Sequence, residues 1–255
     1  MQLDPAQTEL LAGIPNDGST IGNMRLRKNL GWSNDRYFAV RDTLVDAGLV
    51  ELGRGKGGSV RRVAIDPDPP LVFSKELDLY EPLLPVIEHE WAQARRTTPV
   101  AVTITALQGR TATGGTWTRP DITCVALRTF TYVPGSYLDI TTFEVKPIDR
   151  LDVRAVFEAV AHRRAATEVY VLAHAPFGWT RERMQPIADV AMDNGVGFIV
   201  VEDPEDFDTW DELVAPERFH PDPSQLDSFI STQLSEEDRE AVAAKIREVQ
   251  RPPTP

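Results

Sequence analysis

Phe143-Glu144-Val145-Lys146-Pro147 is the stretch of sequence from which the fold and the chemistry of this chain can be worked out. In a β-strand, residues two apart share a face, so Glu144 and Lys146 point the same way while Val145 points into the opposite layer. A carboxylate and an ammonium group side by side among apolar residues are costly to bury without a partner or a purpose. The stretch therefore predicts a strand with a polar, chemically useful face.

A second acidic residue, Asp121 in Arg119-Pro120-Asp121, begins the preceding predicted strand. A turn at Pro134-Gly135 brings that strand back beside the first one. Asp121 lies about thirteen residues before the turn and Glu144 about ten after it, so the two carboxylates are expected at the same end of the sheet, allowing for a bulge. Converging carboxylates bind Mg²⁺ through hard oxygen ligands, and a nearby lysine stabilises developing charge.

Pro120-Asp121 and Glu144-Val145-Lys146 match the motif of the PD-(D/E)XK phosphodiesterases, the restriction-endonuclease-like family. The predicted order of elements over residues 76–204 is also similar to that family: helix, Asp strand, Glu-x-Lys strand, helix, strand. The resemblance implies a Mg²⁺- or Mn²⁺-dependent endonuclease with Asp121, Glu144 and Lys146 as catalytic residues, the two acids being the metal ligands. It also implies a homodimer, because many relatives need two sites to cut both strands.

Hydrophobic periodicity in this region predicts helices alternating with strands. After residue 150 the alternation favours parallel strands, while Pro134-Gly135 favours an antiparallel hairpin, so the fold class is α/β with a mixed sheet flanked by helices. The predicted helices cover residues 85–96, 151–166, 181–194 and a last one from Ser235, and the predicted strands cover residues 100–107, 121–132, 137–145, 169–173 and 197–201.

Three further polar features accompany the predicted site. At 100° per residue, Glu90 falls inside the apolar arc of the helix over 85–96, which makes it a candidate fourth catalytic residue and a further metal ligand; an inward acid paired with an arginine is the alternative. His162 is interpreted as an ordinary surface or helix-terminal histidine. The run Glu202-Asp203-Pro204-Glu205-Asp206 lacks the spacing of a calcium loop and is interpreted as a solvated charge run.

The N-terminal region reads as a separate small domain. Ser33 is a good N-cap, and Gly48 a good C-terminal stop, for the third of three short predicted helices. Residues 49–52 and 59–63 then form two predicted strands joined by a glycine-rich basic tip at residues 53–58. Residues 19–64 carry nine Lys or Arg against four acids, whereas the whole chain has a net charge of −12. This asymmetry favours local, salt-sensitive contact with a polyanion.

Three helices followed by a hairpin with a basic, glycine-rich tip resemble the winged helix-turn-helix family over residues 4–64. By analogy the third helix enters the major groove, and the glycines at the hairpin tip allow close approach to a backbone. Such domains also serve as protein-interaction modules. The residues that the resemblance assigns to DNA contact are Arg25, Arg27, Lys28, Asn34, Arg36, Arg41, Arg54 and Lys56.

The sequence thus predicts a winged helix-turn-helix at 1–65, a linker at 66–75, a nuclease-like domain at 76–215, and an acidic C-terminal segment with one helix at 216–255. Asp66-Pro67-Asp68-Pro69-Pro70 marks the linker. The single cysteine, Cys124, excludes an internal disulfide and a Cys-based zinc site. No apolar run is long enough to span a bilayer and no signal peptide is recognisable, so a cytoplasmic location is expected.

Three functional hypotheses follow. The first is a DNA-targeting, Mg²⁺-dependent nuclease, motivated by Asp121, Glu144 and Lys146. The second is a non-catalytic DNA-binding regulator whose α/β domain dimerises or senses a ligand, since an acidic domain suits a polyanion poorly. The third is a protein-binding adaptor without DNA contact.

Overall fold

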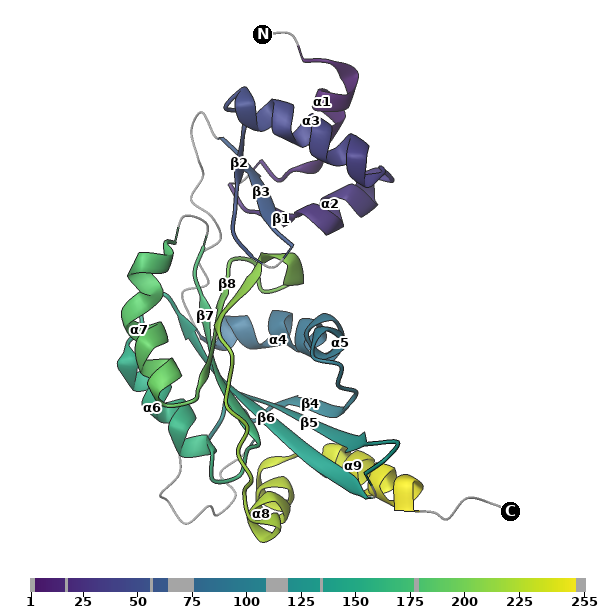
Figure 1. The fold of residues 1–255 in the computed structure, drawn as a ribbon, viewed down its shortest axis with the longest axis vertical. Coiled ribbons are helices and arrows are strands. Elements are labelled where there is room, and N and C mark those ends of the chain that lie inside the picture. The colour runs from purple at the N-terminus through teal and green to yellow at the C-terminus, as the bar shows by residue number, and fades with distance from the viewer. Residues whose placement is uncertain are drawn as a thin grey trace, which may run out of the picture.

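The computed structural model describes residues 3–16, 18–55, 57–63, 76–108, 119–133, 135–176 and 179–250. Two sheets divide these residues into an N-terminal unit, up to residue 63, and an α/β unit, from residue 76. The N-terminal unit lies at one end of the α/β unit, next to the loop that follows β8 (Figure 1). The expected linker at 66–75 falls outside the described residues.

The N-terminal unit packs three helices against a three-stranded antiparallel sheet of order β1-β3-β2. Leu10, Leu26, Tyr37, Leu44 and Val60 form the centre of its core. Ser33 caps the third helix as the sequence predicts, and Asp4 caps the first. Its elements are α1 (Pro5–Gly13), β1 (Ile21–Gly22), α2 (Asn23–Leu30), α3 (Asn34–Asp46), β2 (Val50–Leu52) and β3 (Ser59–Arg62).

The α/β unit is built on a six-stranded mixed sheet of order β4-β5-β6-β7-β8-β9. The pairs β4–β5, β5–β6 and β8–β9 are antiparallel, and β6–β7–β8 are parallel, which confirms the predicted mixed sheet. The strands are β4 (Pro99–Ile104), β5 (Ile122–Thr129), β6 (Ser136–Pro147), β7 (Glu168–His174), β8 (Gly197–Val201) and β9 (Trp210–Val214).

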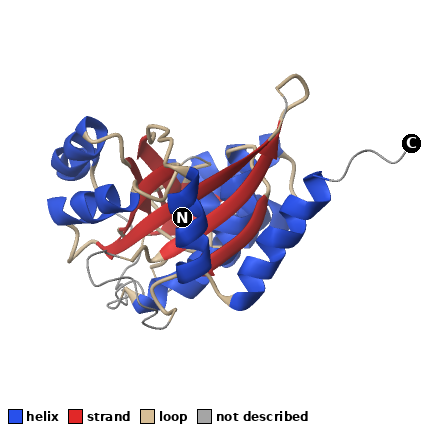
Figure 2. Ribbon diagram, turned by 90° about the horizontal axis from the view of Figure 1, so that it is seen from below, coloured by secondary structure: helices blue, strands red, loops and turns tan. Residues whose placement is uncertain are grey.

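Helices cover both faces of this sheet (Figure 2). One face packs against a continuous helical stretch made of α4 (Leu77–Val86), the π-helical segment η1 (Ile87–Trp91) and α5 (Ala92–Ala94). The other face packs against α6 (Val153–His162), α7 (Arg181–Asp193), α8 (Pro223–Gln233) and α9 (Glu236–Gln250). Along β7, Val169, Val171 and Ala173 face the second layer, while Tyr170 and Leu172 face the first, as strand alternation requires.

Three differences from the predicted elements matter for the site. The helix before the sheet starts at Leu77 and not near Pro85, and both Pro82 and Pro85 lie inside it. The short 3₁₀ turn η2 (Phe207–Thr209), β9 and α8 were not predicted. The expectation of one helix after residue 215 was therefore wrong: both α8 and α9 pack on the core of the sheet.

Across the described parts of the chain, no helix combines the length and the apolar character needed to cross a membrane.

Candidate functional site

The register of the β5–β6 hairpin sets Asp121 opposite Glu144. Ile122 pairs with Phe143, and the ladder continues without a shift to the end of β5. Asp121, one residue before Ile122, donates its backbone N–H to the carbonyl of Phe143 at 3.1 Å, and its Oδ2 accepts the N–H of Val145 at 2.7 Å. The predicted convergence of the two carboxylates at one end of the sheet is therefore confirmed, and it needs no bulge between these strands.

Lys146 lies among three carboxylates on the face of the sheet that α6 covers. Its Nζ is 2.5 Å from Glu144 Oε1, 3.2 Å from Glu76 Oε2 and 3.4 Å from Glu158 Oε2. Glu76 immediately precedes α4, and Glu158 belongs to α6. One half-buried ammonium group thus contacts three acids from different parts of the chain.

Tyr80, on the first turn of α4, connects two of the acids. Its hydroxyl lies 2.6 Å from Asp121 Oδ1 and 2.9 Å from Glu76 Oε1, and its single proton can be donated to only one of them at a time. Glu76 and Tyr80 were missed by the sequence reasoning, because the helix was expected to start later. Their spacing of four residues at a helix start was the signal that could have found them.

Glu90, the predicted fourth catalytic residue, lies outside the site. It is exposed and lines an open surface depression with His89 and Arg25. Residues 87–91 form a π-helical turn, which rotates less per residue than an α-helix, so Glu90 falls short of the inward arc while Trp91 and Ala92 turn towards the sheet. The inward placement of Glu90 was wrong for this reason.

His162 is the last residue of α6, in line with the helix-terminal alternative predicted from the sequence, but it is buried beside the site and not on the surface. It is 5% exposed, and its Nε2 lies 3.9 Å from Glu144 Oε2. Neither ring nitrogen has a hydrogen-bond partner among the described residues. Burial, together with the charge of Lys146, lowers the pKa of His162 to about 4, so the imidazole facing Glu144 is neutral. Ala155, Ala159 and His162 share one helix face, a periodicity that could have placed it inward.

The electrostatics of the site favour a positive partner for its acids. Burial raises the pKa of Asp121 and of Glu144. The charge of Asp121 raises the pKa of Glu144 further, against the lowering effect of Lys146. Keeping both carboxylates ionised so close together therefore costs free energy. A further cation beside them would reduce that cost.

No family model matches this chain, and the curated proteins include none that is similar to it. In the described ranges, no three His, Cys, Asp or Glu side chains are arranged as a ready-made metal-binding group.

The predicted DNA-contact residues fall into two groups. Arg25, Lys28, Asn34 and Arg36 are exposed on α2 and α3, and Arg27 is half-buried. The Arg36 guanidinium lies 4.1 Å from the centre of the Trp32 ring. Arg41 is paired with Asp42 at 2.5 Å, which leaves it less available for a phosphate. Lys56 lies outside the described residues.

The hairpin tip (residues 53–58) faces the protein itself. Its backbone N–H groups at Arg54 and Gly57 donate to Glu202 Oε1 at 3.4 Å and to the carbonyl of Asp208 at 3.1 Å. A Cβ on Gly55 would collide with the backbone of Asp208 and Thr209. The glycines therefore permit the approach of a protein loop, where the sequence suggested a nucleic-acid backbone.

That loop is the acidic loop, residues 202–208. The expectation of a solvated charge run was wrong, because Glu202, Asp206 and Asp208 are buried. Burial raises the pKa of Glu202 to about 7, although Ser59 donates to it at 2.8 Å. Hydrogen bonds from the N-terminal unit compensate for the burial of these acids.

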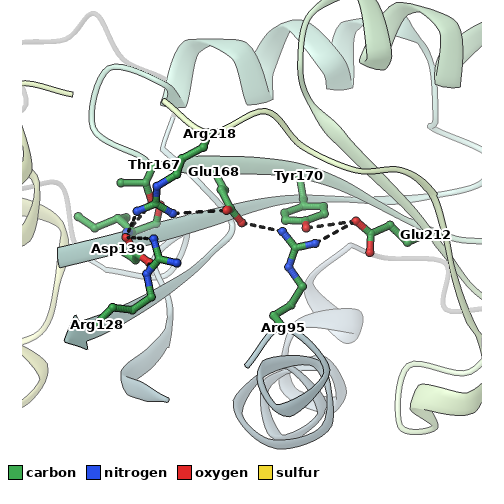
Figure 3. Close-up of polar contacts among 9 residues, drawn as sticks. Arg95, Arg128, Asp139, Thr167, Glu168, Tyr170, Glu212 and Arg218 are labelled. Atoms are coloured by element: carbon green, nitrogen blue, oxygen red, sulfur yellow. Dashed lines mark hydrogen bonds and ion pairs between the residues drawn. The ribbon is translucent and has the colours of Figure 1, made fainter. Parts of the chain in front are cut away.

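A second polar cluster lies at the opposite end of the sheet (Figure 3). Acids and arginines alternate along it: Arg95 pairs with Glu212 at 3.2 Å and Glu168 at 2.9 Å, Arg218 pairs with Glu168 at 3.5 Å, and Arg218 and Arg128 both pair with Asp139. Arg95, Arg128, Asp139 and Glu168 also line a cavity of about 300 Å³. The cluster fastens the segment before α8 to the sheet.

Proposed function

We propose that this chain is a DNA-binding, metal-dependent phosphodiesterase of the PD-(D/E)XK kind, with Asp121, Glu144 and Lys146 as its catalytic residues. The observation that carries the proposal is the β5–β6 register, which sets Asp121 across from Glu144 and puts Lys146 two residues further on the same strand face. The order of elements around these residues supports the same assignment.

The residues fit a hard divalent cation. Carboxylate oxygens are the ligands that Mg²⁺ prefers, and Mg²⁺ usually takes only one or two of them, with water or substrate phosphate completing its shell. Asp121 and Glu144 would hold the ion, and the raised pKa of each shows that an added positive charge would stabilise their ionised forms. Each oxygen of Asp121 accepts one hydrogen bond and keeps a second lone pair. When bound, Mg²⁺ would polarise a phosphoryl oxygen and make water more acidic.

The chain's own residues would orient the metal-binding carboxylates and balance the charge of the substrate. Tyr80 and the N–H of Val145 fix the orientation of the Asp121 carboxylate. Lys146, held by Glu76, Glu144 and Glu158, would turn one donor towards a phosphodiester oxygen as charge develops there. His162 is neutral and has no hydrogen-bond partner in the described chain; its Nε2 faces the second oxygen of Glu144 at 3.9 Å and would help to keep that carboxylate in place.

The N-terminal unit is proposed to bind DNA as a winged helix. Its three helices followed by a β-hairpin support this, as do the exposed Arg25, Lys28, Asn34 and Arg36 on α2 and α3. Asp35, Asp42 and Asp46 on α3 oppose the binding of a polyanion, so we expect contact mainly through phosphates, with a steep salt dependence. A homodimer that presents two sites to the two strands is part of the same proposal.

Cleavage assays test the catalytic half. Parent protein is incubated with plasmid and single-stranded DNA in Mg²⁺ or Mn²⁺, beside Asp121→Asn, Lys146→Ala and, as a matched control, Glu90→Gln. We expect cutting by the parent and by Glu90→Gln, and none by the other two variants. If the parent binds duplex DNA in a mobility-shift salt series yet leaves every substrate intact with both metals, the catalytic half is wrong.

A DNA-binding regulator that senses a ligand is the second candidate. The cavity of about 300 Å³ lined by Arg95, Arg128, Asp139 and Glu168 favours it, since its size suits a small polar molecule. Titration calorimetry with Mg²⁺ separates the two functions. Heat of binding in the parent that is lost in Asp121→Asn supports the phosphodiesterase, and no heat in either supports the regulator.

A further inference from the structure

The acidic loop caps a helix of the N-terminal unit across the joint between the two units. The backbone N–H of Gly22 donates to Asp206 Oδ2 at 2.5 Å, and that of Met24 donates to Asp208 Oδ2 at 2.9 Å. The first N–H groups of a helix have no partner within it, and Gly22 has no side chain with which to cap α2. The two carboxylates supply both the acceptors and the negative charge that this helix end favours.

The same loop covers the hairpin tip. Asp208 accepts the N–H of Gly57 through its carbonyl, and Glu202 accepts the hydroxyl of Ser59 at 2.8 Å. A Cβ on Gly57 would collide with the side chain of Asp208, so the tip and the loop are in direct contact. Arg54, at the tip, lies with its guanidinium 5.6 Å from the centre of the Trp179 ring. While the loop is docked, the hairpin tip cannot touch another molecule along this side.

Opposite charges meet across the joint. The loop has five acids within seven residues. Burial raises the pKa of Glu202, Asp203 and Asp208, and arginines of the N-terminal unit counteract it: Arg25 acts on Asp203, Arg27 on Asp208, and Arg54 and Arg61 on Glu202. Helix N-termini, arginines and glycine-rich tips are also the groups that hold the phosphates of a nucleic-acid backbone. Backbone N–H groups and arginines expected to contact DNA therefore already face carboxylates of the chain itself.

We infer that the acidic loop is an internal substitute for a nucleic-acid backbone, so that docking of this loop and binding of DNA by the hairpin tip and the start of α2 exclude each other. The inference rests on the proposed function for the identity of the polyanion. The chain then exists in a docked form and an open form, and its apparent affinity for DNA is reduced by the fraction that is open.

Two variants open the joint by different means. Asp206→Asn/Asp208→Asn removes the charge that caps α2. Gly22→Ala leaves the net charge unchanged, but its Cβ would come within 2.6 Å of Asp206 Oδ1 and force the loop away. Gly22 has extended backbone angles that alanine adopts without strain. Glu237→Gln/Glu240→Gln, on exposed positions of α9, is the matched control, because it changes the net charge as much as the double aspartate variant.

The full-length proteins are compared by fluorescence anisotropy with a 20-base-pair duplex and by small-angle X-ray scattering, with circular dichroism to verify folding. We expect both joint variants to bind the duplex more tightly than the parent, on the order of tenfold if about a tenth of the parent is open. The control should change little. The radius of gyration should rise in both joint variants, and in the parent when it binds the duplex.

The outcomes distinguish this inference from the proposed function. If the parent binds the duplex but folded Gly22→Ala and Asp206→Asn/Asp208→Asn bind no better, the competition is overturned and DNA binding stands. An equal gain in the α9 control and the double aspartate variant, with none in Gly22→Ala, also overturns it, since net charge alone would then explain the result. If no variant and no parent protein binds DNA at low salt, the DNA-binding function itself fails.

Discussion

The Oδ2 atom of Asp121 accepts the backbone N–H of Val145, the residue that separates Glu144 from Lys146 on β6. One carboxylate thus completes the hydrogen bonding of the strand that carries the other two site residues. Its second oxygen accepts from Tyr80. Asp121 therefore has a structural role that can be measured apart from any catalytic one.

Substitutions at Asp121 should separate these roles. Asp121→Ala leaves the buried Val145 N–H without an acceptor, whereas the Tyr80 hydroxyl keeps Glu76 as its acceptor. The free energy of unfolding should fall by about 1 to 3 kcal/mol. Asp121→Asn keeps one carbonyl oxygen for Val145 and should cost about 1 kcal/mol or less while abolishing cleavage. Urea denaturation of both variants measures the difference. Equal losses of stability would contradict the assignment of the Val145 hydrogen bond.

Lys146 should be important for stability because it is the cation among Glu76, Glu144 and Glu158. Lys146→Met keeps most of the side-chain volume but leaves the carboxylates to repel one another, so we expect a loss of about 3 kcal/mol near neutral pH. Millimolar Mg²⁺ should raise the melting temperature of Lys146→Met more than that of the parent, with NaCl of equal ionic strength as the control. If Lys146→Met has the same melting temperature as the parent, both with and without Mg²⁺, this electrostatic role is excluded.

His162 should affect metal binding more than stability. Because its ring nitrogens have no hydrogen-bond partner within the described chain, His162→Leu should leave the free energy of unfolding unchanged or raise it by about 1 kcal/mol. Calorimetry should nevertheless detect weaker Mg²⁺ binding in His162→Leu, because the group that faces Glu144 Oε2 is removed. His162→Gln, which keeps a polar group there, should bind Mg²⁺ nearly as well as the parent. Unchanged Mg²⁺ affinity in His162→Leu together with reduced stability would make the histidine a packing residue only.

The joint between the two units should weaken as the pH rises. Burial raises the pKa of Glu202 to about 7, above the value of 4.5 that applies to an unfolded glutamate. A raised pKa means that the folded state binds the proton more tightly, so this stability is fully present below pH 4.5 and is lost as the pH rises to about 7. The loss should be about 2 to 4 kcal/mol in the parent relative to Glu202→Gln, which cannot titrate. Thermal denaturation of both proteins across this pH range measures it, and parallel pH profiles would refute the assignment.

The sequence predicted those parts of the fold that local chemistry determines. Strand alternation placed Glu144 and Lys146 on one face, because side chains alternate along a strand with a period of two. Hairpin spacing placed Asp121 beside them, because it depends only on the number of residues on each side of the turn. The helix cap at Ser33 was also predicted from local sequence.

What the sequence did not reveal depends on tertiary packing. Glu90 was placed on the inward face by assuming the period of an ideal α-helix. The π-helical turn that moves it off that face is stabilised by packing of Trp91 and Ala92 on the sheet. His162 and the acidic loop were expected to be exposed to solvent, because the neighbouring sequence does not indicate their buried partners. His162 contacts β6, and the acidic loop contacts the N-terminal unit. Gly55 and Gly57 were noticed, but not the loop that requires them.

The parallel pairing of β6, β7 and β8 has one more consequence. Lys146 stands in register with Ala173, and Ala173 with Val200, so Lys146 and the root of the acidic loop are separated by two strand spacings, or roughly 10 Å. A hydrogen-bonded sheet does not stretch, so in the docked form it keeps the N-terminal unit at a constant distance from Asp121, Glu144 and Lys146. Release of the acidic loop would remove this constraint, so the N-terminal unit would move relative to these three residues without any change in the sheet itself.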